Sequence, residues 1–140
     1  GVDVMRKILI LARESGTRLE LDDILNNSFL PKASLDAVSV DDFLETLKTE
    51  AIHFNEIQQK AAVNNCRLKF VAEFDNGTAN VGLQEIPSDH PFYNLDGSDN
   101  IVLFFTERYS KQPLIIKGAG AGADVTASGL FADIIRIGNN

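Results

Sequence analysis

The sequence predicts an α+β fold in which helices pack on one face of a largely antiparallel or mixed β-sheet. Two observations support this prediction: apolar residues recur at helical spacing in the first half of the chain and again near its end, whereas the stretch between them alternates as strands do. The predicted order is a helix, a short strand, two helices, three or four strands and a final helix. With 140 residues, of which 44% are hydrophobic, we expect a single domain around one core.

The first predicted helix covers residues 3–14 and ends at Ser15-Gly16. Its apolar positions, which fall on one face, are Val4, Met5, Ile8, Leu11 and Ala12. Residues 17–21 could form a short strand. Residues 26–31, which contain an Asn-Asn-Ser run and a proline, predict a loop.

Ser39 marks the start of the second predicted helix, because residues 39–42 resemble a capping box in which its hydroxyl can accept an early helix N–H. Asp42 also lies in the first turn, where the helix dipole favours a negative charge. The apolar spacing continues to Asn64-Asn65, with a break expected near Thr49.

Strand periodicity follows this helix. Residues 68–74 alternate, and the Asn76-Gly77 pair predicts a type I′ hairpin turn before a return strand over residues 79–86. The outer face of this hairpin either meets solvent, which is the default, or pairs with a second subunit. That face carries Arg67, Lys69, Val71 and Glu73.

The apolar run 101–105 predicts a central buried strand, and residues 114–116 predict the last strand. Three alternating glycines then run from Gly118 to Gly122, before a final helix. Because glycine has no Cβ, its backbone can approach a phosphate or a flat ring closely. The alternative is a loop whose glycines only turn the chain. The stretch is not a dinucleotide fingerprint, which opens a βαβ unit, so a nucleotide would meet it within a pocket built elsewhere.

The composition narrows the classes of partner. The net charge is −7, whereas nucleic acid and anionic membranes select clustered lysine and arginine, so we expect neither as a partner. Cys66 is the only cysteine, which predicts no disulfide and no thiolate metal site, a buried structural thiol and a reducing, cytoplasmic location. His53 and His90 are isolated, so we expect structural roles for both and neither a metal site nor a Ser-His-Asp triad.

Asp3 and Lys7 stand four residues apart, on one row of the first helix. The simplest interpretation is an exposed ion pair worth about 0.3–0.5 kcal/mol. Ile10 and Leu11 flank the row, however, and place it at the rim of the apolar face. A partly desolvated lysine there could donate a proton to a developing alkoxide, with the carboxylate holding it in place.

Two segments resemble the homoserine dehydrogenase family. Residues 1–14, GVDVMRKILILARE, resemble the G-x-D-x-x-R-K-x-x-I-L-A-R-E signature of its catalytic helix. Residues 117–137 resemble its C-terminal G-x-G-A-G-x-x-V-T-A-x-G-x-x-A-D-x-x-R element. Between them, residues 89–93 and 97–104 resemble the form found in bifunctional aspartokinase/homoserine dehydrogenase. The resemblance covers nearly the whole chain in family order.

This resemblance implies reduction of L-aspartate 4-semialdehyde to L-homoserine, on the route to threonine and methionine, by a homodimer formed through the sheet. It implies that Lys7 donates a proton to the substrate carbonyl oxygen and that Asp3 is its carboxylate partner. Gly122, with Ala121 beside it, would approach the nicotinamide end of the cofactor. NADP or NAD would be bound mainly by a domain upstream of Gly1, so the chain would be a fragment with half an active site and no activity alone.

A second hypothesis is a non-catalytic dimerisation or regulatory module of an amino-acid biosynthesis enzyme. In that case Asp3 and Lys7 form only an ion pair. A small-molecule sensor of the ACT type would need βαββαβ order, which the predicted elements do not have.

Overall fold

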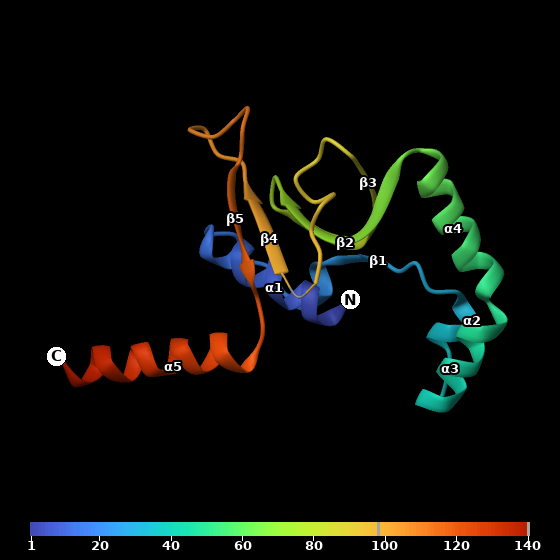
Figure 1. Cartoon of the computed structure of the whole chain (residues 1–140), viewed down its shortest axis with the longest axis horizontal. Coiled ribbons are helices and arrows are strands. Elements are labelled where there is room, and N and C mark those ends of the chain that lie inside the picture. Colours follow the sequence, from blue (N-terminus) through green and yellow to red (C-terminus); the bar gives the residue numbers. More distant parts are fainter. Residues whose placement is uncertain (98, 140) are drawn as a thin grey trace. The chain divides into compact units, whose positions relative to one another are not determined.

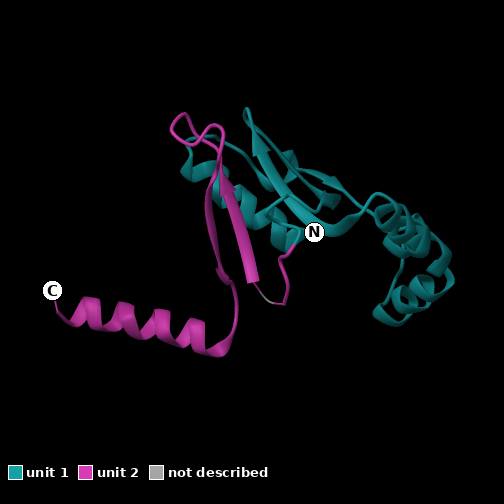
Figure 2. Cartoon of the chain, turned by 45° about the horizontal axis from the view of Figure 1, so that its top comes forward, with its two compact units in different colours: residues 1–93 teal, residues 94–140 magenta. Residues whose placement is uncertain are grey.

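The computed structural model describes residues 1–97 and 99–139 (Figure 1). The chain divides into two compact units, residues 1–93 and 94–140, each with its own sheet (Figure 2). The first unit contains α1 (Val2–Glu14), the 3-10 helix η1 (Leu21–Asp23), β1 (Leu25–Asn27), α2 (Lys32–Leu35), α3 (Val40–Thr49), α4 (Ala51–Val63), β2 (Cys66–Asp75) and β3 (Thr78–Pro87). The second unit contains β4 (Asp99–Phe104), β5 (Leu114–Ala119) and α5 (Ala123–Gly138). Helices combined with mixed and antiparallel sheets confirm the predicted α+β class.

The β2–β3 hairpin is the centre of the first unit. Its strands pair antiparallel from Cys66 opposite Pro87 to Asp75 opposite Thr78. Between them Asn76 has φ 47° and Gly77 has φ 81°, the two positive values that a type I′ turn requires. The Asn-Gly prediction is therefore confirmed.

The core of this unit lies between α1 and one face of the hairpin (Figure 1). Two residues of α1 one turn apart, Ile8 and Ala12, are buried. Ile8 joins a cluster with Ile24, Ala79 and Val81. Aromatic and aliphatic side chains of β2 pack around this cluster, so the alternation read from the sequence places the predicted face inward.

Two predictions on the connection after α1 are wrong. Residues 17–21 form no strand, and a strand, β1, occurs at Leu25–Asn27, where a loop was expected. β1 pairs parallel with β3, with Leu25 opposite Asn80. Its residues are exposed and two of its three are asparagine, so its composition does not predict a strand. The strand forms because this segment pairs with β3, which is distant in the sequence. In residues 17–21, side chains instead bond the Leu19 carbonyl and the Glu20 N–H.

The cap and the break predicted in the second helical stretch are both confirmed. The Asp42 N–H donates to Ser39 Oγ at 3.1 Å, and the stretch divides at Glu50 into α3 and α4. The short α2 was not predicted, and the Thr46 hydroxyl donates to Ser34 Oγ at 3.1 Å, which ties α3 to it.

The outer face of the hairpin is partly occupied by the chain itself. The Arg67 guanidinium lies 4.5 Å from the centre of the Tyr93 ring and donates to the Tyr93 carbonyl at 3.2 Å. Val71 is only 9% exposed. The default expectation of a solvent-facing surface therefore fails at Val71, whereas Arg67 stays exposed although it contacts Tyr93. Cys66, expected to be buried, is half-buried.

In the second unit, β4 and β5 pair antiparallel, from Asp99 opposite Ala119 to Phe104 opposite Leu114. The prediction of a central buried strand for 101–105 is wrong within the described residues, because β4 has β5 as its one partner there and its apolar residues are half-buried. An apolar run predicts that both faces of a strand are buried, but it does not identify the elements that bury them. The final helix is confirmed as α5. Among the described helices, none is long and apolar enough to cross a membrane.

Candidate functional site

α1 brings the two candidate catalytic side chains together. Lys7 Nζ lies 3.0 Å from Asp3 Oδ2, and the side chains are 58% and 79% exposed respectively. The pair satisfies the simpler interpretation of the sequence, an exposed i,i+4 ion pair. The partial desolvation expected of Lys7 is not provided by the residues described. Both groups are open to a ligand.

The position of this pair on α1 follows from the helix itself. Asp3 lies in the first turn, where the unpaired backbone N–H groups favour a carboxylate, and Gly1 supplies no side-chain cap. Ile8 is buried in the sequence position next to Lys7, so packing against the hairpin turns the Asp3–Lys7 row away from the core. On one side of the row Leu11 is half-buried, and on the other Ile10 is 60% exposed. The row therefore borders an exposed apolar side chain.

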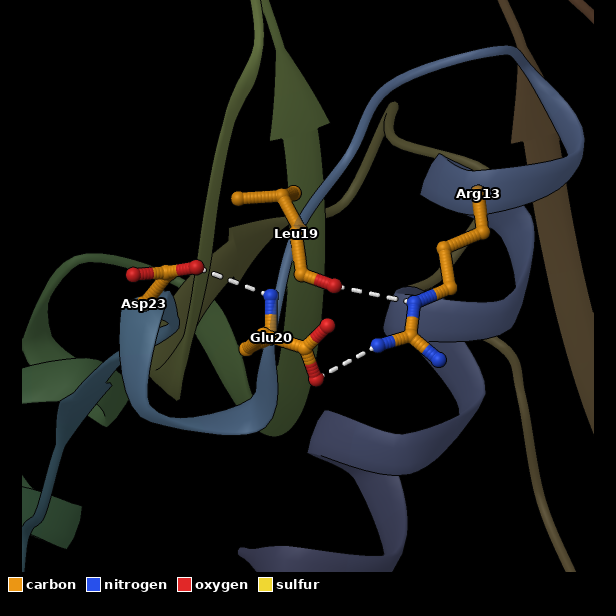
Figure 3. Close-up of polar contacts among 4 residues, drawn as sticks. All are labelled: Arg13, Leu19, Glu20 and Asp23. Atoms are coloured by element: carbon orange, nitrogen blue, oxygen red, sulfur yellow. Dashed lines mark hydrogen bonds and ion pairs between the residues drawn. The ribbon is translucent and has the colours of Figure 1, made fainter.

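The other end of α1 is anchored by a network that the sequence analysis missed (Figure 3). Arg13 Nε donates to the Leu19 carbonyl at 2.9 Å, and its Nη2 lies 2.7 Å from Glu20 Oε2. The Glu20 N–H in turn donates to Asp23 Oδ2 at 2.8 Å, within a reciprocal capping box at the start of η1. The spacing of an acceptor and an acid three residues apart, Glu20 to Asp23, was the available signal.

The connection between β5 and α5 is residues 120–122, so two of the three glycines lie where the sequence predicted them. Gly118 lies within β5, and Gly122 is the residue that precedes α5. Gly122 has φ 138° and ψ 151°, a conformation that only glycine adopts readily. A Cβ built on it would meet no atom within 4 Å, and Ala121 is exposed. The fold thus requires glycine at this position and leaves open space beside its backbone.

The four candidate site residues fall into two groups. Asp3 and Lys7 belong to the first unit, where they are in contact. Ala121 and Gly122 belong to the second unit, where they are neighbours in one connection. Each group has a defined local geometry of its own.

Both histidines make contacts within the chain, which fits the structural roles predicted for them. His53 Nε2 lies 3.0 Å from the Phe29 carbonyl oxygen. His90 Nδ1 accepts the N–H of Phe92 at 3.1 Å, and the two rings meet edge to face. In the described part of the chain, no group of three histidine, cysteine or acidic side chains is placed to hold a metal ion.

A shallow hollow lies elsewhere, along α3. It is lined by Asp41, Leu44, Glu45, Leu47 and Lys48. Neither pair of candidate residues contributes to it. It is open to solvent, and its lining holds an ion pair between Lys48 and Glu45, so we do not consider it a catalytic site.

Known proteins resemble this chain over nearly its whole length. The homoserine dehydrogenase family model matches residues 1–135. Bifunctional aspartokinase/homoserine dehydrogenase 2, chloroplastic, of Zea mays is 44% identical over 139 residues, which are 98% of this chain and 15% of the maize protein. Homoserine dehydrogenase of Saccharomyces cerevisiae is 39% identical over 140 residues, which are 98% of this chain and 39% of the yeast protein.

One solved structure is similar throughout. A crystal structure of a Candida auris protein of unknown function is 39% identical and has a TM-score of 0.87, covering 100% of this chain and 40% of that one. The chain therefore spans less than half the length of each of these relatives.

Proposed function

Because the chain belongs to the homoserine dehydrogenase family, we propose that it is the catalytic and dimerisation region of an enzyme that interconverts L-aspartate 4-semialdehyde and L-homoserine. NADH or NADPH is the proposed electron donor. Since the chain spans only 39% of the yeast relative, the proposal places residues 1–140 in a longer polypeptide, the full-length enzyme. The dinucleotide is bound mainly by the remainder of that polypeptide.

The observation that carries this proposal is the Asp3–Lys7 pair on α1. Its Nζ–Oδ2 distance of 3.0 Å brings an ammonium and a carboxylate together on an exposed helix row. Lys7 supplies the ammonium group that donates a proton in the reduction. Asp3 keeps that ammonium in one place, which limits the loss of side-chain entropy when substrate binds.

A nicotinamide cofactor, when bound, would supply the hydride that the aldehyde carbon receives in the proposed reduction. Lys7 donates a proton to the carbonyl oxygen as negative charge develops there, so that C=O becomes CH–OH and the lysine is left neutral. In the oxidation of homoserine, neutral Lys7 accepts the proton of the hydroxyl group. Asp3 does not change its protonation in either direction.

The connection before α5 fits a flat, charged cofactor ring. Gly122 has no Cβ and stands in open space, and Ala121 carries only a methyl group. The proposal assigns the backbone of these two residues to the nicotinamide end of the cofactor, where a larger side chain would hold the ring away.

We also propose a homodimer formed through the sheet. The sequence suggests it through the outer face of the hairpin, which carries Arg67, Lys69, Val71 and Glu73. A second surface, which is apolar, lies on β5 in the other unit, where Leu114 is 43%, Ile115 45% and Ile116 57% exposed. Covering them removes apolar surface from water. Light scattering on the 140-residue chain should give twice 15.3 kDa, and Ile116→Lys should shift it towards the monomer. A monomer for the unsubstituted chain would contradict this part of the proposal.

The proposed setting is the cytoplasm and the formation of threonine and methionine, although the maize relative is named as chloroplastic. Growth of a homoserine-requiring microbial strain, restored by the full-length enzyme, tests the pathway. Failure of the expressed, folded enzyme to restore growth would contradict it.

The direct test is homoserine-dependent formation of NADH or NADPH, followed by absorbance. The full-length enzyme should show it, whereas residues 1–140 alone should not, because hydride transfer needs the cofactor held in line with the reacting carbon. A full-length enzyme that binds neither homoserine nor dinucleotide would favour the alternative, a non-catalytic dimerisation or regulatory module.

A further inference from the structure

The three alternating glycines have different surroundings. A Cβ built on Gly118 or Gly122 would lie in open space. A Cβ built on Gly120 would instead overlap the side chain of Asn100, meeting Nδ2 first and lying 2.5 Å from Cγ. Real Cβ atoms do not approach other atoms so closely. A side chain at position 120 would therefore displace the Asn100 amide from the place it holds beside this backbone.

Asn100 is well placed to act on this connection. It is the second residue of β4, and its Cα partner in the ladder is Gly118 of β5. Its side chain lies across the backbone of Gly120, the first residue after β5 ends. The amide thus spans from the last paired residues of the hairpin to the start of the connection.

A second contact fixes the same end of the hairpin. Asp99, the neighbour of Asn100 in β4, forms an ion pair with Lys117 of β5, with Oδ2 and Nζ 3.7 Å apart. Lys117 and Gly120 stand on either side of the last paired residues, Gly118 and Ala119. Two adjacent residues of β4 therefore contact this end: Asp99 pairs with Lys117 of β5, and Asn100 lies beside Gly120 of the connection.

We propose that Asn100 is a positioning residue for the glycine connection: by packing against Gly120, it sets the path of the backbone from β5 into Gly122. The assignment of Gly122 to the cofactor, on which the functional consequence depends, rests on the proposed function. Gly122 is glycine because of its backbone conformation, whereas a side chain at position 120 would displace the Asn100 amide. A displacement of about 1 Å in a group that positions a reactant can cost about 10²-fold in rate.

A double-mutant cycle in the full-length enzyme tests the contact itself. Gly120→Ala should lower the Tm measurably, because the new methyl group displaces the Asn100 amide. Asn100→Ala in the same chain should restore most of that loss, since it empties the space that the methyl group needs. Gly129→Ala is the matched control: its Cβ would meet open space, and the Tm should not fall. An unchanged Tm for Gly120→Ala, or no recovery in the double variant, would overturn the inference.

Steady-state kinetics test the positioning role. Asn100→Ala should raise the KM for the dinucleotide by about 10-fold or more while leaving the KM for homoserine within about twofold. If Asn100 is only structural, its substitution lowers the Tm and changes both KM values together, or it changes neither KM. Either result would overturn the positioning role. If the full-length enzyme has no dehydrogenase activity, the proposed function fails, but the Tm cycle still decides whether Asn100 and Gly120 are coupled.

Discussion

α1 and α5 both carry regularly spaced apolar residues, yet only α1 buries some of them among the described residues. α1 buries Ile8 and Ala12 against the hairpin and is anchored at its end by Arg13. α5 has no buried residue among those described, and Phe131 and Ile134 are 65% and 64% exposed. Periodicity thus predicts a helix equally well in both cases without saying what the helix packs against. The side chains of α1 are oriented by contacts that this chain supplies.

The largest expected effect is on the rate, at α1. In the full-length enzyme, Lys7→Ala should lower kcat by roughly 10²–10⁴, the usual range for a general acid or base. Lys48→Ala is the matched control, because Lys48 also forms an exposed ion pair with a carboxylate on a helix, at 2.6 Å. It should leave kcat unchanged. Equal kcat values for Lys7→Ala and the parent would remove Lys7 from the mechanism.

The next effect separates the two helices by stability. Ile8→Ala should lower the free energy of unfolding by about 2–4 kcal/mol, because it leaves a cavity in the α1 core. Ile134→Ala in α5 should change it by less than about 0.5 kcal/mol in the 140-residue chain. Urea titrations of the two variants give both values. Similar losses for the two would show that α5 is as well packed as α1.

A smaller effect is expected at the connection before α5. Gly122→Val should cost roughly 1–3 kcal/mol of stability, because valine at φ 138° is strained. It should also raise the KM for the dinucleotide. Ala121→Val avoids the strained position, so it should raise that KM with little change in Tm. If both variants leave the KM unchanged, the connection is only a turn.

The anchor of α1 is expected to contribute less. Arg13→Ala removes a charge-assisted bond to the Leu19 carbonyl and an exposed ion pair with Glu20, and should cost about 1 kcal/mol. Arg13→Lys should recover part of that loss, since an ammonium can still reach one acceptor. Thermal unfolding of both variants provides the check. A loss of more than about 3 kcal/mol would mean that the network does more than fasten the end of α1.

The smallest effect is on the pH dependence of stability. The Asn64 side chain, with Lys60 beside it, holds the pKa of the Glu85 carboxyl below its ordinary value of 4.5. Because the folded pKa is lowered, the contribution of Glu85 is fully present above about pH 4.5 and is lost as the pH falls through the folded pKa. Glu85→Gln should flatten the stability of the chain in that acidic range. An unaltered pH profile would contradict this.

Features set by near neighbours in the sequence were predictable. The Ser39 cap, the Asn76-Gly77 turn and the Asp3–Lys7 row each depend on residues at most four apart. Features set by distant partners were not. β1 is a strand because of β3, and the space beside Gly120 is filled by Asn100 of another strand. In both cases the local sequence does not reveal the feature, because a residue or strand far along the chain determines it.

Chemical rescue of Lys7→Ala tests the central claim, that α1 supplies the proton, most directly. A small primary amine, added to the full-length Lys7→Ala enzyme, can occupy the space that the side chain leaves and donate the proton in its place. The account predicts that kcat rises with amine concentration and saturates, with no such rise for the Lys48→Ala enzyme. A Lys7→Ala enzyme that loses activity but shows no rescue by amines of any size, while still binding homoserine and dinucleotide normally, would contradict a proton-donating role for Lys7.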